Sequence, residues 1–213
     1  MPIRYSCFIS YRHGQRKLAE RIINDLTEAL ASELEVWVNN DEEVYVDRDR
    51  LKGGDFYNES LAEALCESVC MIMIFTPNYF SPEHTFCARE YKAMEKLEEQ
   101  RFQAMGGRAE NKRGLIIPIV FRGEECLPKE IKERRQYYNF DEFLLSDTEI
   151  FRHPQYAPKI REIAEIIGNH YRRLRPVLQD PKHDCKKFTL PSEDEIKQWL
   201  ESAQGATSPF PGR

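Results

Sequence analysis

The sequence predicts an α/β protein in which a parallel sheet of five strands is covered by helices on both faces. Two continuous apolar runs, residues 69–75 and 114–121, have the character of strands buried on both faces of a parallel sheet. Between such runs, apolar residues recur with a period near 3.6, which is typical of amphipathic helices. This alternation implies right-handed crossovers and a three-layer sandwich.

The expected elements follow one another along the chain without an internal repeat. Residues 36–38 predict either an edge strand or a loop. Pro118 has no backbone donor, which predicts an edge, a bulge or a strand end at that position. Strands are expected at 3–11, 44–46, 69–75, 114–121 and 137–140, and helices at 18–30, 58–68, 87–102 and 158–174.

The length of 213 residues fits one α/β domain with an appendage. We assign residues 1–175 to that domain and residues 176–213 to a partly flexible C-terminal extension. Ser192 and Glu195 have the spacing of a capping box, which predicts one short helix in the extension. Docking of its apolar side on the chain's own domain is favoured over docking on a partner. The extension is either a tail or the beginning of another domain.

Composition argues against several classes of function. The net charge is -5 and the pI is near 5.7, so no basic face for nucleic acid is expected. The longest apolar run is too short to span a bilayer as a helix, so no membrane association is expected. The first residues lack the apolar core of a secretory signal, and several of the six cysteines lie in apolar runs as small hydrophobes. A cytoplasmic location is therefore expected.

The sequence also lacks the motifs of several common sites. No set of His and Cys has the spacing of a metal centre, so no metal is expected. Gly53 and Gly54 belong neither to a Walker loop nor to a GxGxxG fingerprint, and there is no GxSxG elbow.

Polar or irregular residues follow the first three expected strands, at 10–12, 47–49 and 76–77. In parallel α/β sheets, ligands bind at the carboxyl ends of the strands. The sequence therefore predicts a binding cleft at this edge of the sheet. Arg12 either contacts an anionic ligand there or leads the chain out to solvent.

The segment after the second expected strand carries acidic and basic side chains in alternation. It is either a self-neutralising surface turn, or Asp47 holds the strand end while Arg48 or Arg50 reaches a phosphate, which the fixed fork of arginine suits. Gly54 gives the backbone freedom for a tight turn. Phe56 is either a staple for the following helix or a stacking surface for a planar ring.

Glu90 is the leading candidate for a catalytic group. At the start of a helix a glutamate meets the macrodipole favourably, and this structural role is the commoner one. Its expected place at the carboxyl edge of the sheet, near the aromatic Phe86, instead favours an active-site carboxylate.

Four segments in order along the chain together resemble the Toll/interleukin receptor (TIR) domain family in its bacterial form. The resemblance covers roughly residues 3–175 and implies the flavodoxin-like sandwich of that family. Residues 8–12 are similar to the first box of the family, and residues 46–56 are similar to its second strand and BB loop. Residues 75–79 are similar to the exit of the third strand, and residues 117–119 are similar to the fourth strand.

Many members of this family cleave NAD with a glutamate in a Trp-x-x-x-Glu motif. The resemblance places Glu90 in the catalytic position, with Phe86 where the motif has Trp. The same mapping implies further residues that line the pocket: Tyr11, Arg12, Asp47, Gly54 and Phe56.

The chemistry of NAD cleavage suits these residues. Breaking the nicotinamide–ribose bond builds positive charge on the sugar, which a single carboxylate stabilises. The leaving group is already cationic, so no general acid is required. Phe56 or Phe86 would stack on a ring of the substrate, and Arg12 or Arg50 would face the pyrophosphate. NAD is thus expected as a substrate, and no cofactor is expected.

The resemblance also implies how the activity is used. Family members usually act when assembled through homotypic TIR–TIR contacts, with the BB loop of a neighbour completing the pocket, so a lone chain is expected to be weakly active or silent. The product would be ADP-ribose or a cyclic or conjugated derivative that signals, perceived by a downstream effector protein. Bacterial relatives commonly serve in defence against phage.

Two readings compete with the NAD-cleaving enzyme, and the first of them belongs to another class of function. The first is a non-catalytic scaffold that pairs TIR domains through the BB loop. Because Phe86 stands where the motif has Trp, this reading stays open. The second is a nucleoside-processing transferase on a similar sheet, which would also use a lone carboxylate. Retention of Glu90 favours the NAD-cleaving enzyme.

Overall fold

The computed structural model describes residues 3–13, 17–38, 43–46, 56–106, 113–144, 150–178 and 184–205. At its centre lies a parallel sheet of five strands in the order β2-β1-β3-β4-β5. The expected α/β class and the parallel sheet are confirmed. The strands are β1 (Tyr5–Tyr11), β2 (Glu43–Val46), β3 (Ser68–Phe75), β4 (Ile116–Val120) and β5 (Tyr138–Asn139).

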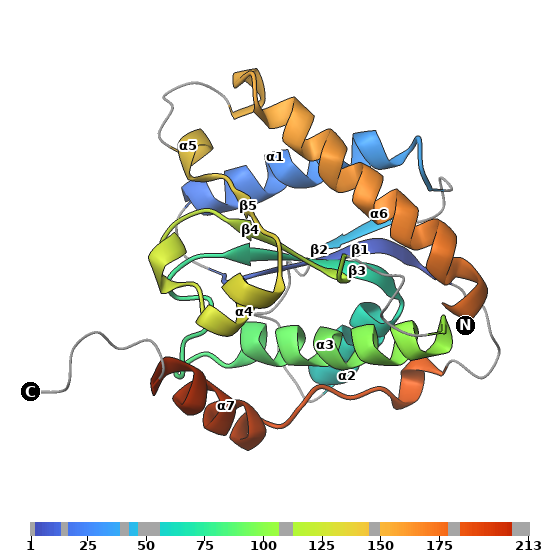
Figure 1. Ribbon diagram of the computed structural model, residues 1–213, viewed down its shortest axis with the longest axis vertical. Helices are drawn as coiled ribbons and strands as arrows, with labels where there is room; N and C mark the ends of the chain where they lie inside the picture. Colours follow the sequence, from blue (N-terminus) through green and yellow to red (C-terminus); the bar gives the residue numbers. More distant parts are fainter. Residues whose placement is uncertain are drawn as a thin grey trace, which may run out of the picture.

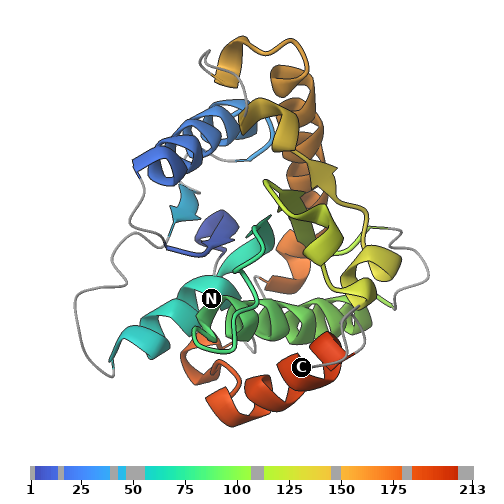
Figure 2. The same cartoon turned by 90° about the vertical axis from the view of Figure 1, so that its left-hand side faces the viewer.

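Helices cover both faces of this sheet (Figure 1). On one face α1 (Lys17–Leu34) packs against α6 (Tyr156–Leu178), and on the other α2 (Phe56–Cys66) packs against α3 (Phe86–Ala104). The short helices α4 (Lys129–Arg134) and α5 (Asp141–Leu144) precede and follow β5. A further helix, α7 (Glu193–Gly205), lies on the outer side of α3, as both views show (Figure 2).

The two central strands carry the core. Every residue of β1 and of β3 is buried, as expected for strands covered on both faces. Cys7 of β1 lies opposite Cys70 of β3, and both are free thiols inside the core. Burial raises the pKa of Cys7 to about 12, so it behaves as a small hydrophobe rather than a nucleophile.

Pro118 corrects one sequence expectation, because it lies in the middle of β4, and β4 is an interior strand. Phe121 N donates to Phe75 O on β3, whereas Val120 O accepts from Phe140 N on the β5 side. Odd-numbered residues of β4 therefore bond to β3, and even-numbered residues face β5. Pairing with β5 begins only at Ile119, so the missing donor of Pro118 faces a place that β5 does not reach.

Residues 35–38 form a turn after α1, so of the two alternatives for 36–38 the loop is the one observed. The last strand is shorter than expected and consists of Tyr138 and Asn139. Its short length follows from the elements on either side, because α4 ends at Arg134 and α5 begins at Asp141.

The C-terminal extension packs against α3 through α7. Ser192 and Glu195 form the expected capping box, in which Ser192 N donates to Glu195 Oε2 over 2.8 Å and Glu195 N donates to Ser192 Oγ over 3.3 Å. The indole of Trp199 stacks on the Tyr91 ring of α3 with centroids 5.9 Å apart, and Ile196 and Leu200 are buried. The extension therefore covers the outer side of the helix that carries Glu90.

A disulfide adds a covalent link between the extension and the domain. Cys66 at the end of α2 is bonded to Cys185, 119 residues later in sequence, with the two Cα atoms 5.5 Å apart. The partner of Cys66 lies in the extension, and such a long-range pairing leaves no local signal in the sequence. Both cysteines are buried.

His170 is a buried titratable group on α6. Burial lowers the pKa of its imidazole to about 4, while a hydrogen bond with the Gly114 backbone and the nearby Glu98 carboxylate act in the opposite direction. The neutral form is therefore the one that the folded protein accommodates.

We expect acid to destabilise the protein through His170. An unfolded histidine titrates near 6.5, so between about pH 6.5 and pH 4 the unfolded chain binds a proton that the folded chain does not bind. The free energy of unfolding should fall across this window by up to about 3 kcal/mol. Urea unfolding of the wild type and of His170→Leu at pH 4 to 7 measures the contribution of His170 to the free energy of unfolding. Parallel pH profiles for the two proteins would contradict the prediction.

Loss of the disulfide should lower stability. Cys185→Ser is expected to reduce the free energy of unfolding by about 2–5 kcal/mol, because the crosslink restricts the unfolded chain. Thermal unfolding without reductant measures this, with Cys126→Ser, at an exposed free cysteine, as the matched control. Alkylation of the denatured, unreduced protein should modify four thiols; modification of all six would show that the bond is absent.

Candidate functional site

A buried chain of hydrogen bonds joins the end of β1 to α3 and to the turn after β3. Ser10 Oγ donates to Glu90 Oε2. The same serine oxygen lies 2.5 Å from the hydroxyl oxygen of Tyr79. None of the three residues has exposed surface. Three side chains from three different elements therefore meet inside the protein.

Local structure explains why these residues meet. Ser10 is the next-to-last residue of β1, and Tyr79 lies in the turn after β3, where its N–H donates to Thr76 O over 2.8 Å. β1 and β3 are adjacent parallel strands, so their carboxyl ends share one edge of the sheet. Glu90 is one of the buried residues of α3, and its contact with Ser10 places it on the side of the helix that faces the sheet.

Glu90 lies one turn into α3 rather than at its very start. The first turn of this helix contains no acidic residue, and Glu90 faces the sheet instead of the solvent around the N-terminus. Compensation of the helix macrodipole, which acts within the first turn, therefore does not explain its position. A carboxylate without contact with water requires donors such as the Ser10 hydroxyl to remain charged.

Phe86 and Arg89 form the outer side of the same helical turn. The Arg89 guanidinium lies over the Phe86 ring, 5.5 Å from its centroid, and Arg89 Nε donates to Pro191 O over 2.8 Å. Burial lowers the pKa of Arg89, whereas the carboxylates of Glu193 and Glu90 act in the opposite direction. Arg89 therefore connects the turn that carries Glu90 with the C-terminal extension.

Tyr11 and Arg12 follow Ser10 at the end of β1. Tyr11 is buried, and its ring stacks on the imidazole of His13 with centroids 4.3 Å apart. Arg12 Nη1 donates to Asn78 O over 2.9 Å. This contact links the turn after β3 to the end of β1 and leaves both alternatives for Arg12 open. A role toward a ligand stays a prediction for both residues.

The remaining expected site residues are not characterised by the structure. Asp47, Arg50 and Gly54 lie outside the described residues, and so does most of the segment 46–56. Phe56 is the first residue of α2, but its side chain is also outside what the structure describes. Their assignment to the pocket stays a prediction.

Ser10 and Tyr79 were not among the site residues proposed from the sequence. One signal was available for Ser10, because a serine inside a strand that is buried on both faces needs a hydrogen-bond partner. Tyr79 had no such signal, because its hydroxyl reaches a residue 69 positions earlier. Only the fold brings the two together.

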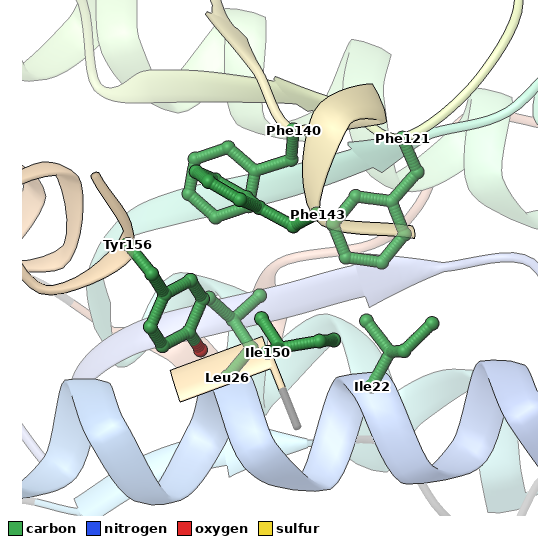
Figure 3. Close-up of a pocket in the computed structure, with 7 residues that line it drawn as sticks. All are labelled: Ile22, Leu26, Phe121, Phe140, Phe143, Ile150 and Tyr156. Carbon is green, nitrogen blue, oxygen red and sulfur yellow. The ribbon is translucent and has the colours of Figure 1, made fainter. Parts of the chain in front are cut away.

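A small cavity lies between α1, the N-terminus of α6 and the ends of β4 and β5 (Figure 3). Its volume of about 10 Å³ has room for about one water molecule. The Tyr156 hydroxyl has no hydrogen-bond partner among the described residues. None of the expected site residues that the structure describes lines this cavity, which is a gap in the apolar core. It is lined by Ile22, Leu26, Phe121, Phe140, Phe143, Ile150 and Tyr156.

In the part of the chain that the structure describes, no three side chains of His, Cys, Asp or Glu lie close enough together to hold a metal ion. Within the same ranges, no helix is both long enough and apolar enough to cross a membrane.

Comparison with known proteins gives a family and, among solved structures, a weak likeness. A family model described as TIR domain matches residues 7–153. Among solved structures, the chain is similar to one from "Structure of the activated Roq1 resistosome directly recognizing the pathogen effector XopQ (TIR domains)", with 16% identity over 93% of this chain and 98% of that chain and a TM-score of 0.38. No curated protein matches the chain.

Proposed function

The chain belongs to the TIR domain family, and from this premise we propose that it cleaves NAD⁺ at the nicotinamide–ribose bond, with Glu90 as the catalytic carboxylate. The observation that supports this proposal is the placement of Glu90. It is bonded to Ser10 at the carboxyl end of β1, beside the carboxyl end of β3. This edge of a parallel sheet is where ligands of such folds bind.

In the proposed reaction, the C–N bond between nicotinamide and the ribose breaks, and its electron pair neutralises the cationic pyridine nitrogen. Positive charge then builds on the ribose, where the Glu90 carboxylate stabilises it. A water oxygen bonds to the ribose carbon and releases one proton, which gives ADP-ribose. Attack by a group of the nucleotide itself, or of another acceptor, gives a cyclic or conjugated product. NAD⁺ is the substrate, and the reaction needs no further cofactor.

The proposal requires a change of conformation before catalysis. Glu90 has no exposed surface in the structure, so the groups that cover it must move when the ribose binds. Closure and opening around a substrate is a common step in enzymes. Homotypic assembly, in which the BB loop of a neighbouring chain completes the pocket, would supply such a change. A single chain would then be weakly active or silent.

The same proposal includes a biological role. A cytoplasmic enzyme of this kind would act in antiphage defence, either by exhausting NAD⁺ or by producing an ADP-ribose signal for a downstream effector protein. Its trigger would be the event that assembles the chains.

The alternative is a non-catalytic scaffold that works through TIR–TIR contacts. One observation favours it, namely that the Glu90 carboxylate is fully buried and hydrogen-bonded in the manner of a structural core residue. In that case Glu90 would affect stability and not chemistry.

We expect Glu90→Gln to abolish nicotinamide release from NAD⁺. The amide keeps the shape of the side chain and an acceptor for Ser10, but it removes the negative charge that stabilises the ribose cation, so the rate should fall by at least about 100-fold. Release is followed by chromatography at high protein concentration and after clustering of the chains on a surface.

Glu99→Gln is the matched control, because Glu99 is an exposed glutamate on the same helix. It should release nicotinamide at the wild-type rate, and circular dichroism should show all three proteins folded. Equal release by Glu90→Gln and the wild type would exclude Glu90 as the catalytic group. An absence of release from every clustered protein would favour the scaffold.

A further inference from the structure

We propose that Ser10 and Tyr79 are positioning residues for Glu90, acting as a two-step hydrogen-bond relay that fixes its carboxylate at the end of β1. This inference rests on the proposed function, because it assigns a role within the same site. It goes beyond the resemblance, which gives a role to Glu90 but none to Ser10 or Tyr79. The relay is formed by three buried side chains on β1, on the turn after β3 and on α3.

The direction of the relay follows from the number of protons available. A serine hydroxyl carries one proton, and Ser10 uses it toward Glu90 Oε2. The Ser10 oxygen is then left as an acceptor toward Tyr79, 2.5 Å away. The phenol of Tyr79 must therefore donate to Ser10, and Ser10 to Glu90. Both bonds point toward the carboxylate.

Such a relay strengthens the charge that the proposed reaction needs. Hydrogen bonds that donate to a carboxylate favour its ionised form over the acid. Two bonds in series polarise one another in a buried, low-dielectric setting, so the Tyr79 hydroxyl acts on Glu90 without touching it. The relay therefore favours the ionised form of the Glu90 carboxyl, whose residue has no exposed surface.

The surroundings of Tyr79 make the relay rigid. Its ring packs edge-on against Phe80, with centroids 4.8 Å apart, and tilted against Phe75, at 6.2 Å. The backbone N–H of Tyr79 donates a hydrogen bond to Thr76 O. Arg12 donates to the backbone carbonyl of Asn78, which precedes Tyr79 in the sequence. Tyr79 is thus held in place through both its backbone and its ring, as a positioning residue requires.

Tyr79→Phe tests the relay most cleanly, because it removes one hydroxyl and keeps the packed ring. Ser10→Ala removes the direct donor. Tyr91→Phe is the matched control, since Tyr91 is a buried tyrosine on α3 whose hydroxyl bonds to Glu95 rather than to this site. All three are compared with the wild type by the pH titration of the Glu90 carboxyl ¹³C signal, assigned with the Glu90→Gln protein, and by the kinetics of NAD⁺ cleavage.

We expect the Glu90 signal to titrate at higher pH in Ser10→Ala by about one unit, and by a smaller amount in Tyr79→Phe. The turnover number should fall by about 10- to 100-fold in Ser10→Ala, with KM little changed, and less in Tyr79→Phe. The acid limb of the pH–rate profile should move upward with the carboxyl titration. Tyr91→Phe should leave all three measurements at their wild-type values.

The proposal is overturned if Tyr79→Phe leaves both the Glu90 titration and the pH profile unchanged, whether or not it lowers the melting temperature. A purely structural role would give that result. The titration does not depend on catalysis. If the wild type releases no nicotinamide, the proposed function fails, while the carboxyl titration still decides whether Ser10 and Tyr79 control Glu90.

Discussion

The burial of the Glu90 carboxylate is the constraint on which the site depends. A carboxylate removed from water is stable only where donors replace the lost hydration. Here one such donor is Ser10, whose hydroxyl links α3 to the end of β1.

The same helix holds a second buried glutamate, and the comparison separates two kinds of carboxylate. Glu98 forms a bidentate ion pair with Arg135, whose Nη1 lies 2.9 Å from Glu98 Oε2 and whose Nη2 lies 3.2 Å from Glu98 Oε1. The same carboxylate also accepts a hydrogen bond from Leu115 N. Leu115 precedes β4 and Arg135 follows α4, so Glu98 links α3 to both of these segments. Gly114 leaves space for the Glu98 carboxylate, because a Cβ at position 114 would lie 2.6 Å from Glu98 Oε2. Glu98 is neutralised by a cation, as a structural carboxylate should be. Glu90 lies at the carboxyl edge of the sheet, where it accepts from the Ser10 hydroxyl and interacts electrostatically with Arg89.

Periodicity was sufficient to predict the sheet and its helices, because burial on both faces leaves continuous apolar runs and burial on one face leaves a helical stripe. It was sufficient to place Glu90 on α3 near the strand ends, but not to orient it. The relay from Tyr79 and the disulfide from Cys66 join residues 69 and 119 positions apart. Such contacts depend on the packed fold and leave no local pattern. Pro118 was misplaced for a related reason, because the length of β5 decides whether its missing donor matters.

The position of α3 also depends on residues beyond the matched family region, which ends at residue 153. Arg89, next to Glu90, donates to Pro191 O, and Trp199 packs edge-on against Phe80, the neighbour of Tyr79 in sequence. The extension therefore contacts both elements that bring side chains to Ser10. Because packed interiors transmit small shifts, any movement of the extension would change the position of the Glu90 carboxylate. The domain boundary expected at residue 175 stays a prediction, but the physical unit that holds Glu90 includes residues on both sides of it.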